Sequence, residues 1–212
     1  MSGTVPNSAA MRSPLRLGAG CLCVRTRWYT LKSSWILSAI SKGVGMGLDA
    51  VVFCNCVEKG CLSVPHPHPR LLYIASNGSP EIRSKDPAEV DEHDKWMELP
   101  PCEHEDMMLD GCELGNVGSI SHLHKILTGV SRMHGLACPV LLEKVLYSGS
   151  HCGDHLSVRD VHRLSNELDR LEEAMPSATA LSGKDARQIA LAIKELKQLV
   201  KTALAVNKPI AF

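Results

Sequence analysis

The stretch Leu48-Asp-Ala-Val-Val-Phe-Cys54 is apolar and rich in β-branched residues. Such a run predicts a buried β-strand, because branched side chains fit a pleated, covered surface. Two further strands are expected after it, at Leu71–Ile74 and Glu81–Arg83. The turn dipeptide Asn77-Gly78 would fold the last strand back onto the one before it. The N-terminal half therefore predicts a small, antiparallel sheet.

The second half of the chain has the periodicity of amphipathic helices. Apolar residues recur at three-and-four spacing in four segments, Ile120–Val130, Val140–Leu146, Val161–Leu171 and Ile189–Val200. Strands that are followed by helices are typical of an α+β domain. The fold class expected is α+β, with a small antiparallel sheet from the N-terminal half packed against three or four C-terminal helices.

Local signals set the expected ends of these helices. Ser157 with Asp160, and Ser182 with Asp185, form capping boxes at the start of the last two helices. The acidic segment from residue 85 to residue 98 predicts a further short helix that ends near Trp96. The glycines that follow are expected to form a loop. They are Gly111, Gly115 and Gly118.

The formal net charge of zero averages two unlike parts of the chain. Residues 1–45 carry six of the 23 basic residues and no acid, which leaves 17 basic and 23 acidic residues, a net charge of −6, from Met46 onward. An acidic body argues against a nucleic-acid partner, because affinity for phosphate backbones depends on Lys and Arg. No apolar run reaches the roughly 18 residues that a membrane span needs, so a membrane partner is not expected.

Residues 1–45 are rich in Ser, Arg and Gly and do not belong to the predicted fold. Acid-free, Arg-rich N-termini are typical of organelle transit peptides. The alternative, which we favour, is that translation begins at Met46, because helical amphipathicity upstream is poor and Met46 opens directly onto the strand pattern. We therefore predict a disordered extension over 1–45, a single α+β domain over 46–205 and a tail over 206–212.

Cysteine usage bears on the compartment. Seven of the nine cysteines and all ten histidines follow residue 46. An odd number of cysteines, close pairs such as Cys54-Asn-Cys56 and the lack of a convincing signal peptide favour free thiols in a reducing compartment. The sequence therefore predicts a cytoplasmic protein.

Thiol, imidazole and carboxylate side chains gather in two segments of the predicted domain. They are Cys102, His104 and Glu105 in the first segment, and His151, Cys152, Asp154 and His155 in the second. These are the donors that zinc and related divalent ions select. Both segments lie beside prolines or glycines that interrupt regular structure, where a scaffold can aim side chains into one pocket. We predict zinc or another divalent metal at Cys102, His104, His151 and Asp154. The alternative is that these side chains stabilise loops, since their spacing matches no established zinc pattern.

Two other cysteine positions suggest chemistry. Cys54 and Cys56 lie two apart at a strand end, on the same face. They could form a soft metal pair, a strained redox couple or two buried, inert thiols. Cys152 is flanked by a histidine and a glycine and could act as a nucleophile, with a base such as His104 supplied from elsewhere.

Two histidine pairs have simpler explanations. His66 and His68 alternate along the proline-rich segment 64–69, whose extended backbone explains their spacing as well as metal ligation does. His122 and His124 lie two apart on a predicted helix, so they point to different faces and cannot easily share an ion.

Three separated motifs carry a resemblance. They are Met46-Gly-Leu-Asp-Ala50, Cys102-Glu-His104, and Lys144-Val-Leu-Tyr-Ser-Gly149 followed by His151, Gly153 and Asp154. In this order they resemble a group of short uncharacterised bacterial proteins that begin at the equivalent of Met46, over residues 46 to about 171. The resemblance implies the later start site, and it implies no activity, ligand or partner.

The function expected from these observations is that of a small intracellular binding or regulatory protein that holds one divalent ion. One alternative is a metal-dependent hydrolase that uses the same residues with an open coordination position. Another is a protein-interaction or inhibitor module that works through the acidic residues 86–94. The apolar stripe of the C-terminal helix could also serve a protein partner, although packing within the domain is the simpler explanation.

Overall fold

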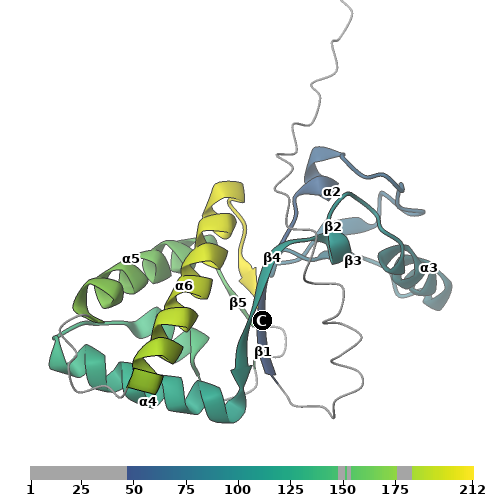
Figure 1. Cartoon of the computed structure of the whole chain (residues 1–212). Coiled ribbons are helices and arrows are strands. Elements are labelled where there is room, and N and C mark those ends of the chain that lie inside the picture. The colour runs from purple at the N-terminus through teal and green to yellow at the C-terminus, as the bar shows by residue number, and fades with distance from the viewer. Residues whose placement is uncertain (1–46, 148–150, 152–153, 176–182) are drawn as a thin grey trace, which may run out of the picture.

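The computed structural model describes residues 47–147, 151, 154–175 and 183–212. The fold is organised around strand β1 (Gly47–Phe53). This strand lies inside a four-stranded sheet of order β4-β1-β6-β5, formed with β4 (Met108–Asn116), β5 (His155–Leu156) and β6 (Ile210–Ala211). All three pairings are antiparallel. The small antiparallel sheet and the C-terminal helices confirm the predicted α+β class (Figure 1).

The prediction of a loop at Gly111, Gly115 and Gly118 is wrong. The first two glycines lie in β4 and the third lies in the first turn of helix α4 (Val117–Met133). Gly115 has a φ of +110° and pairs with Leu48, next to a shift in register. The shift in register marks a bulge in β4, and this position favours glycine because a side chain would be strained at that φ. Glycine marks strand irregularities as well as turns, which is why the pattern misled.

The segment predicted as a tail, residues 206–212, is also part of the fold. It contains β6, which lies between β1 and β5, with Val51 opposite Ala211. Ile210 is buried, and the buried Lys208 side chain forms an ion pair with Glu58. A strand of two residues carries no periodic signal, so the sequence pattern could not reveal it.

The helices after β4 lie together on one side of the sheet (Figure 1). They are α4, the short η2 (Leu141–Val145), α5 (Val158–Ala174) and α6 (Gly183–Val206). The larger core lies between them and the sheet, and the apolar stripe of α6 is buried there. Ser157 caps α5 as predicted, whereas Ser182 lies outside the described residues. None of the helices in the described ranges combines the length and apolar character that a membrane crossing requires.

Residues 54–107 form a separate lobe between β1 and β4 (Figure 1). Its elements are α2 (Cys56–Lys59), β2 (Leu72–Ile74), β3 (Pro80–Ile82), α3 (Pro87–Glu98) and η1 (Glu105–Met107). The antiparallel pairing of β2 with β3 and the short acidic helix match the prediction. The lobe has a small core of its own, distinct from the core under the helices.

Candidate metal centre

The two ends of the lobe meet where β1 ends and β4 begins. Cys54 follows the last residue of β1, and its backbone N–H donates to the carbonyl oxygen of Met107 over 2.7 Å. Cys56 opens helix α2 two positions later. On the other segment, Cys102 and His104 lie just before η1, which leads into β4. The antiparallel pairing of β1 with β4 therefore brings the Cys-x-Cys and Cys-x-His segments side by side.

Three sulfur atoms and one imidazole nitrogen converge at this point. The Sγ atoms of Cys54 and Cys102 are 3.7 Å apart. The Nδ1 atom of His104 lies 3.3 Å from the Sγ atom of Cys56 and 3.6 Å from that of Cys102. All four donor atoms lie within 4.8 Å of one another. We call Cys54, Cys56, Cys102 and His104 the neck cluster.

Three of the separations in the neck cluster match those of a tetrahedral zinc site. Zn–S bonds near 2.3 Å and Zn–N bonds near 2.0–2.1 Å place two sulfurs about 3.8 Å apart, and a sulfur and a nitrogen about 3.5 Å apart. The observed distances of 3.7, 3.6 and 3.3 Å differ from these values by ~0.2 Å or less. Three of the six donor-to-donor separations therefore fit one tetrahedrally bound ion, and the other three do not exceed 4.8 Å.

The three thiols of the neck cluster are buried, and His104 is partly buried. Burial, with a smaller contribution from the neighbouring Cys102, raises the pKa of Cys54 to about 11. Burial and the neighbouring Cys54 also raise the pKa of Cys56. A divalent cation among the sulfurs would reverse this effect, because it stabilises thiolates and its binding releases their protons.

The core of the lobe is poor in large apolar side chains. Its buried residues are Cys54, Cys56, Trp96, Cys102 and Met107, so cysteines make up most of them. A small lobe with such a core buries little apolar area, and small folds of this kind commonly gain stability from a bound metal. The position and the composition of the core both suit a structural ion.

The other half of the predicted metal set lies next to β6. The Nε2 atom of His151 is 3.0 Å from the backbone oxygen of Tyr147, and its ring contacts the rings of Tyr147 and Phe212. The backbone oxygen of Asp154 accepts a hydrogen bond from the Phe212 N–H over 3.0 Å. Among the described residues, neither His151 nor Asp154 joins the neck cluster. Cys152 lies outside the described residues.

The sequence predicts Cys102 and His104 as metal ligands, and both lie in the neck cluster, but the pattern does not connect them with Cys54 and Cys56. Cys54 and Cys102 are 48 positions apart in the chain. The available signal was the shared spacing of Cys54-Asn-Cys56 and Cys102-Glu-His104, in which one residue separates two donors. That signal becomes informative only when β1 is known to pair with β4.

A second group of histidines in the lobe forms hydrogen bonds within the chain. His66 and His93 are buried, and the His66 Nε2 atom lies 3.0 Å from the His93 Nδ1 atom. The Nδ1 atom of His66 accepts from the backbone N–H of His68 over 2.9 Å, and the Nε2 atom of His68 lies 2.9 Å from a Glu92 oxygen. These bonds account for the alternating histidines of the proline-rich segment without metal ligation.

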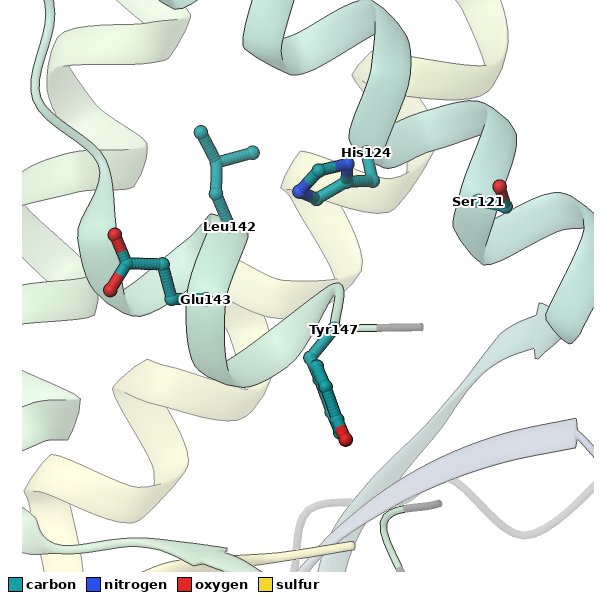
Figure 2. Close-up of a pocket in the computed structure, with 5 residues that line it drawn as sticks. All are labelled: Ser121, His124, Leu142, Glu143 and Tyr147. Carbon is teal, nitrogen blue, oxygen red and sulfur yellow. The ribbon is translucent and has the colours of Figure 1, made fainter. Parts of the chain in front are cut away.

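The histidines of α4 have separate surroundings. The Nε2 atom of His122 lies 3.0 Å from an Asp185 oxygen. His124 lines a hollow of about 340 Å³ together with Ser121, Leu142, Glu143 and Tyr147 (Figure 2). Figure 2 shows the Glu143 carboxylate and the Tyr147 ring pointing away from the His124 ring. The hollow therefore does not bring these groups together as an acid–base pair.

Comparison of the chain with protein-family models, with curated proteins and with solved structures finds no match. The resemblance to short bacterial proteins therefore stays a prediction from the motifs. The neck cluster is the feature of the described residues from which a function can be argued.

Proposed function

We propose that the chain is a small binding protein whose lobe is stabilised by one zinc ion, held by the neck cluster as a closed structural centre. One observation supports this function most directly: the four donor atoms of the neck cluster lie within 4.8 Å of one another. Three thiolates and one imidazole are a common structural zinc set, and zinc favours sulfur and nitrogen donors in tetrahedral arrangement.

The donor count supports a structural role over the hydrolase that the sequence left open. A catalytic zinc takes three protein ligands and keeps a fourth position for water or substrate. The neck cluster supplies four donors, which would fill a tetrahedral site. Its three sulfurs are also buried, which limits approach of a substrate. An ion in this position would fix the two ends of the lobe relative to the sheet.

The acidic helix α3 gives less support to an interaction module. Its carboxylates are largely exposed, but several have partners within the chain. Lys95 lies 2.5 Å from Asp91 and His68 lies 2.9 Å from Glu92. The Lys95 ammonium neutralises part of the negative face and His68 occupies a further carboxylate, so the charge by itself does not favour a basic partner.

The proposal is tested by metal analysis of the full chain, purified without a histidine tag or chelator. We expect one zinc ion per chain. Cobalt exchanged into the site should give thiolate-to-metal charge-transfer absorption and the visible bands of a tetrahedral centre. A chain that retains no zinc and takes none up on titration would overturn the proposal.

Three variants locate the ion. Cys56→Ser removes one ligand and should release the zinc or weaken its binding by at least about ten-fold. Cys138→Ser is the matched control, because Cys138 is a buried cysteine of the larger core, and it should keep the ion. His151→Ala should also keep the ion. Loss of zinc from His151→Ala with retention in Cys56→Ser would favour the set predicted from the sequence.

A further inference from the structure

Cys54 and Cys102 face each other across the two ends of the lobe. Their Sγ atoms are 3.7 Å apart. A disulfide needs an S–S distance of about 2.05 Å, so the sulfurs would have to approach by ~1.7 Å. Rotation of the two side chains can supply this shift. The backbone hydrogen bond from Cys54 to Met107 keeps the segments side by side meanwhile.

Cys56 is the poorer disulfide partner. Its Sγ atom lies 3.3 Å from the Nδ1 atom of His104, closer than the 3.6 Å that separates the Cys102 Sγ atom from the same nitrogen. A bond between Cys54 and Cys56 would also close a small ring around a single intervening residue, and so short a ring strains both the peptide and the disulfide. The geometry therefore favours the pair formed by Cys54 and Cys102.

We propose that Cys54 and Cys102 are a site of reversible oxidation, at which a peroxide converts two metal-bound thiolates to a disulfide and the metal leaves. This inference rests on the proposed function, because it takes the zinc-loaded neck cluster as the reduced state. His104 is only partly buried, so a small oxidant can approach the sulfurs from its side.

The chemistry balances with hydrogen peroxide as the oxidant. One thiolate attacks the peroxide, the O–O bond breaks, and a sulfenic acid and one hydroxide form. The second thiolate then attacks the sulfenic sulfur, the S–S bond forms, the S–O bond breaks and a second hydroxide leaves. The two sulfurs together lose two electrons, which reduce the peroxide. Cys56 and His104 remain as two ligands, too few for a closed zinc site.

Metal and disulfide would then be alternative links between the same two segments. In the reduced, loaded state the ion joins Cys54 to Cys102, and in the oxidised state a covalent bond joins them. The lobe should keep its shape in both states. It should lose that shape only when the chain is reduced and metal-free.

The test treats the full, zinc-loaded chain with hydrogen peroxide. A zinc-responsive dye measures the released ion, and peptide mass spectrometry without reduction identifies the linked cysteines. We expect one zinc released for each Cys54–Cys102 disulfide, and recovery of binding after dithiothreitol. The oxidised chain should resist trypsin within 54–107, whereas the reduced, chelated chain should be cut there. A disulfide that contains Cys56, or sulfinic acid in place of a disulfide, would overturn the inference.

Cys56→Ser separates this inference from the proposed function. The variant lacks a metal ligand but keeps both sulfurs of the pair, so peroxide should still link Cys54 to Cys102. If the wild-type chain binds no zinc but forms this disulfide, the metal proposal fails and the oxidation site stands. If it binds zinc but does not form the disulfide, the oxidation site fails and the metal proposal stands. Cys138→Ser should behave as the wild type in both assays.

Discussion

The Nε2 atom of His66 lies 3.0 Å from the Nδ1 atom of His93, and both rings are buried. The backbone N–H of His68 donates to the other nitrogen of His66. A backbone N–H can only donate, so neutral His66 carries its proton on Nε2 and donates it to His93. An added proton on His93 Nδ1 would face the Nε2–H of His66, and an added proton on His66 Nδ1 would face the backbone N–H of His68. Either proton would set two donors against each other. The folded lobe therefore requires both rings to be neutral.

We expect the stability of the lobe to fall in mild acid. Burial lowers the pKa of His66, and the adjacent His93 lowers it further. Burial also lowers the pKa of His93, against the opposing charges of Asp94 and Glu81. Below about pH 6.5 the unfolded chain therefore binds protons that the folded chain does not. The free energy of unfolding should be highest above that pH and fall as the pH drops towards the lowered pKa values.

Urea unfolding from pH 8 to pH 5 measures this dependence. His93→Gln should reduce the slope of stability against pH by up to about 1.4 kcal/mol per pH unit, the contribution of one proton. Any metal contribution is common to the variant and the wild type. His162→Gln, at an exposed position of α5, is the control and should leave the slope unchanged. Equal slopes in His93→Gln and the wild type would contradict the expectation.

Removal of the proposed zinc ion should unfold the lobe and leave the helices in place, because the two parts have separate cores. Hydrogen exchange on the reduced chain, with and without a chelator, measures both parts in one molecule. Amides within 54–107 should lose protection by at least about ten-fold, equivalent to ~1.4 kcal/mol of local stability. Amides of α5 and α6 provide the internal control. Uniform loss of protection over the whole chain would instead indicate a single cooperative unit.

The sequence contained enough to predict the elements with strong periodic patterns. The β-branched run at β1 indicates a strand over several consecutive residues, and the apolar stripe of α6 indicates a helix over several turns. Strand β4 was hidden because Gly111 and Gly115 read as turn signals, although pairing with β1 makes them strand residues. Strand β6 has two residues, and its conformation is set by neighbouring strands and not by its own composition.

Only half of the candidate site was predictable from the sequence, because the other half depends on strand pairing. Cys102 and His104 stand out by composition, and they are half of the neck cluster. The other half depends on which distant segment lies beside them, and this is decided by the pairing of β1 with β4. A sequence pattern that predicts a loop at β4 gives no reason to place Cys54 and Cys56 next to Cys102. The full neck cluster was therefore hidden by one missed strand.

The buried carboxylate of Glu167 should contribute strongly to stability. Its oxygens accept hydrogen bonds from the backbone N–H groups of Val140 and Leu141, over 3.0 and 2.8 Å. Glu167→Gln replaces one acceptor by a donor that faces an N–H group, so we expect a loss of about 1–3 kcal/mol in urea unfolding. Glu172→Gln, at an exposed ion pair with Lys197, should cost less than about 1 kcal/mol. Equal losses would mean that the buried bonds contribute no more than a surface pair.

Truncation of Ile210 tests whether β6 supports the fold. Its side chain is 1% exposed, in the core between the sheet and the helices. Ile210→Ala leaves a cavity there, and we expect it to lower the free energy of unfolding by about 2–5 kcal/mol. Leu191→Ala is the matched control, because this leucine of α6 is 57% exposed, and its change should stay within about 0.5 kcal/mol. If the two variants unfold at the same urea concentration, residues 206–212 behave as the tail that the sequence suggested, and the central place of β6 in the sheet is wrong.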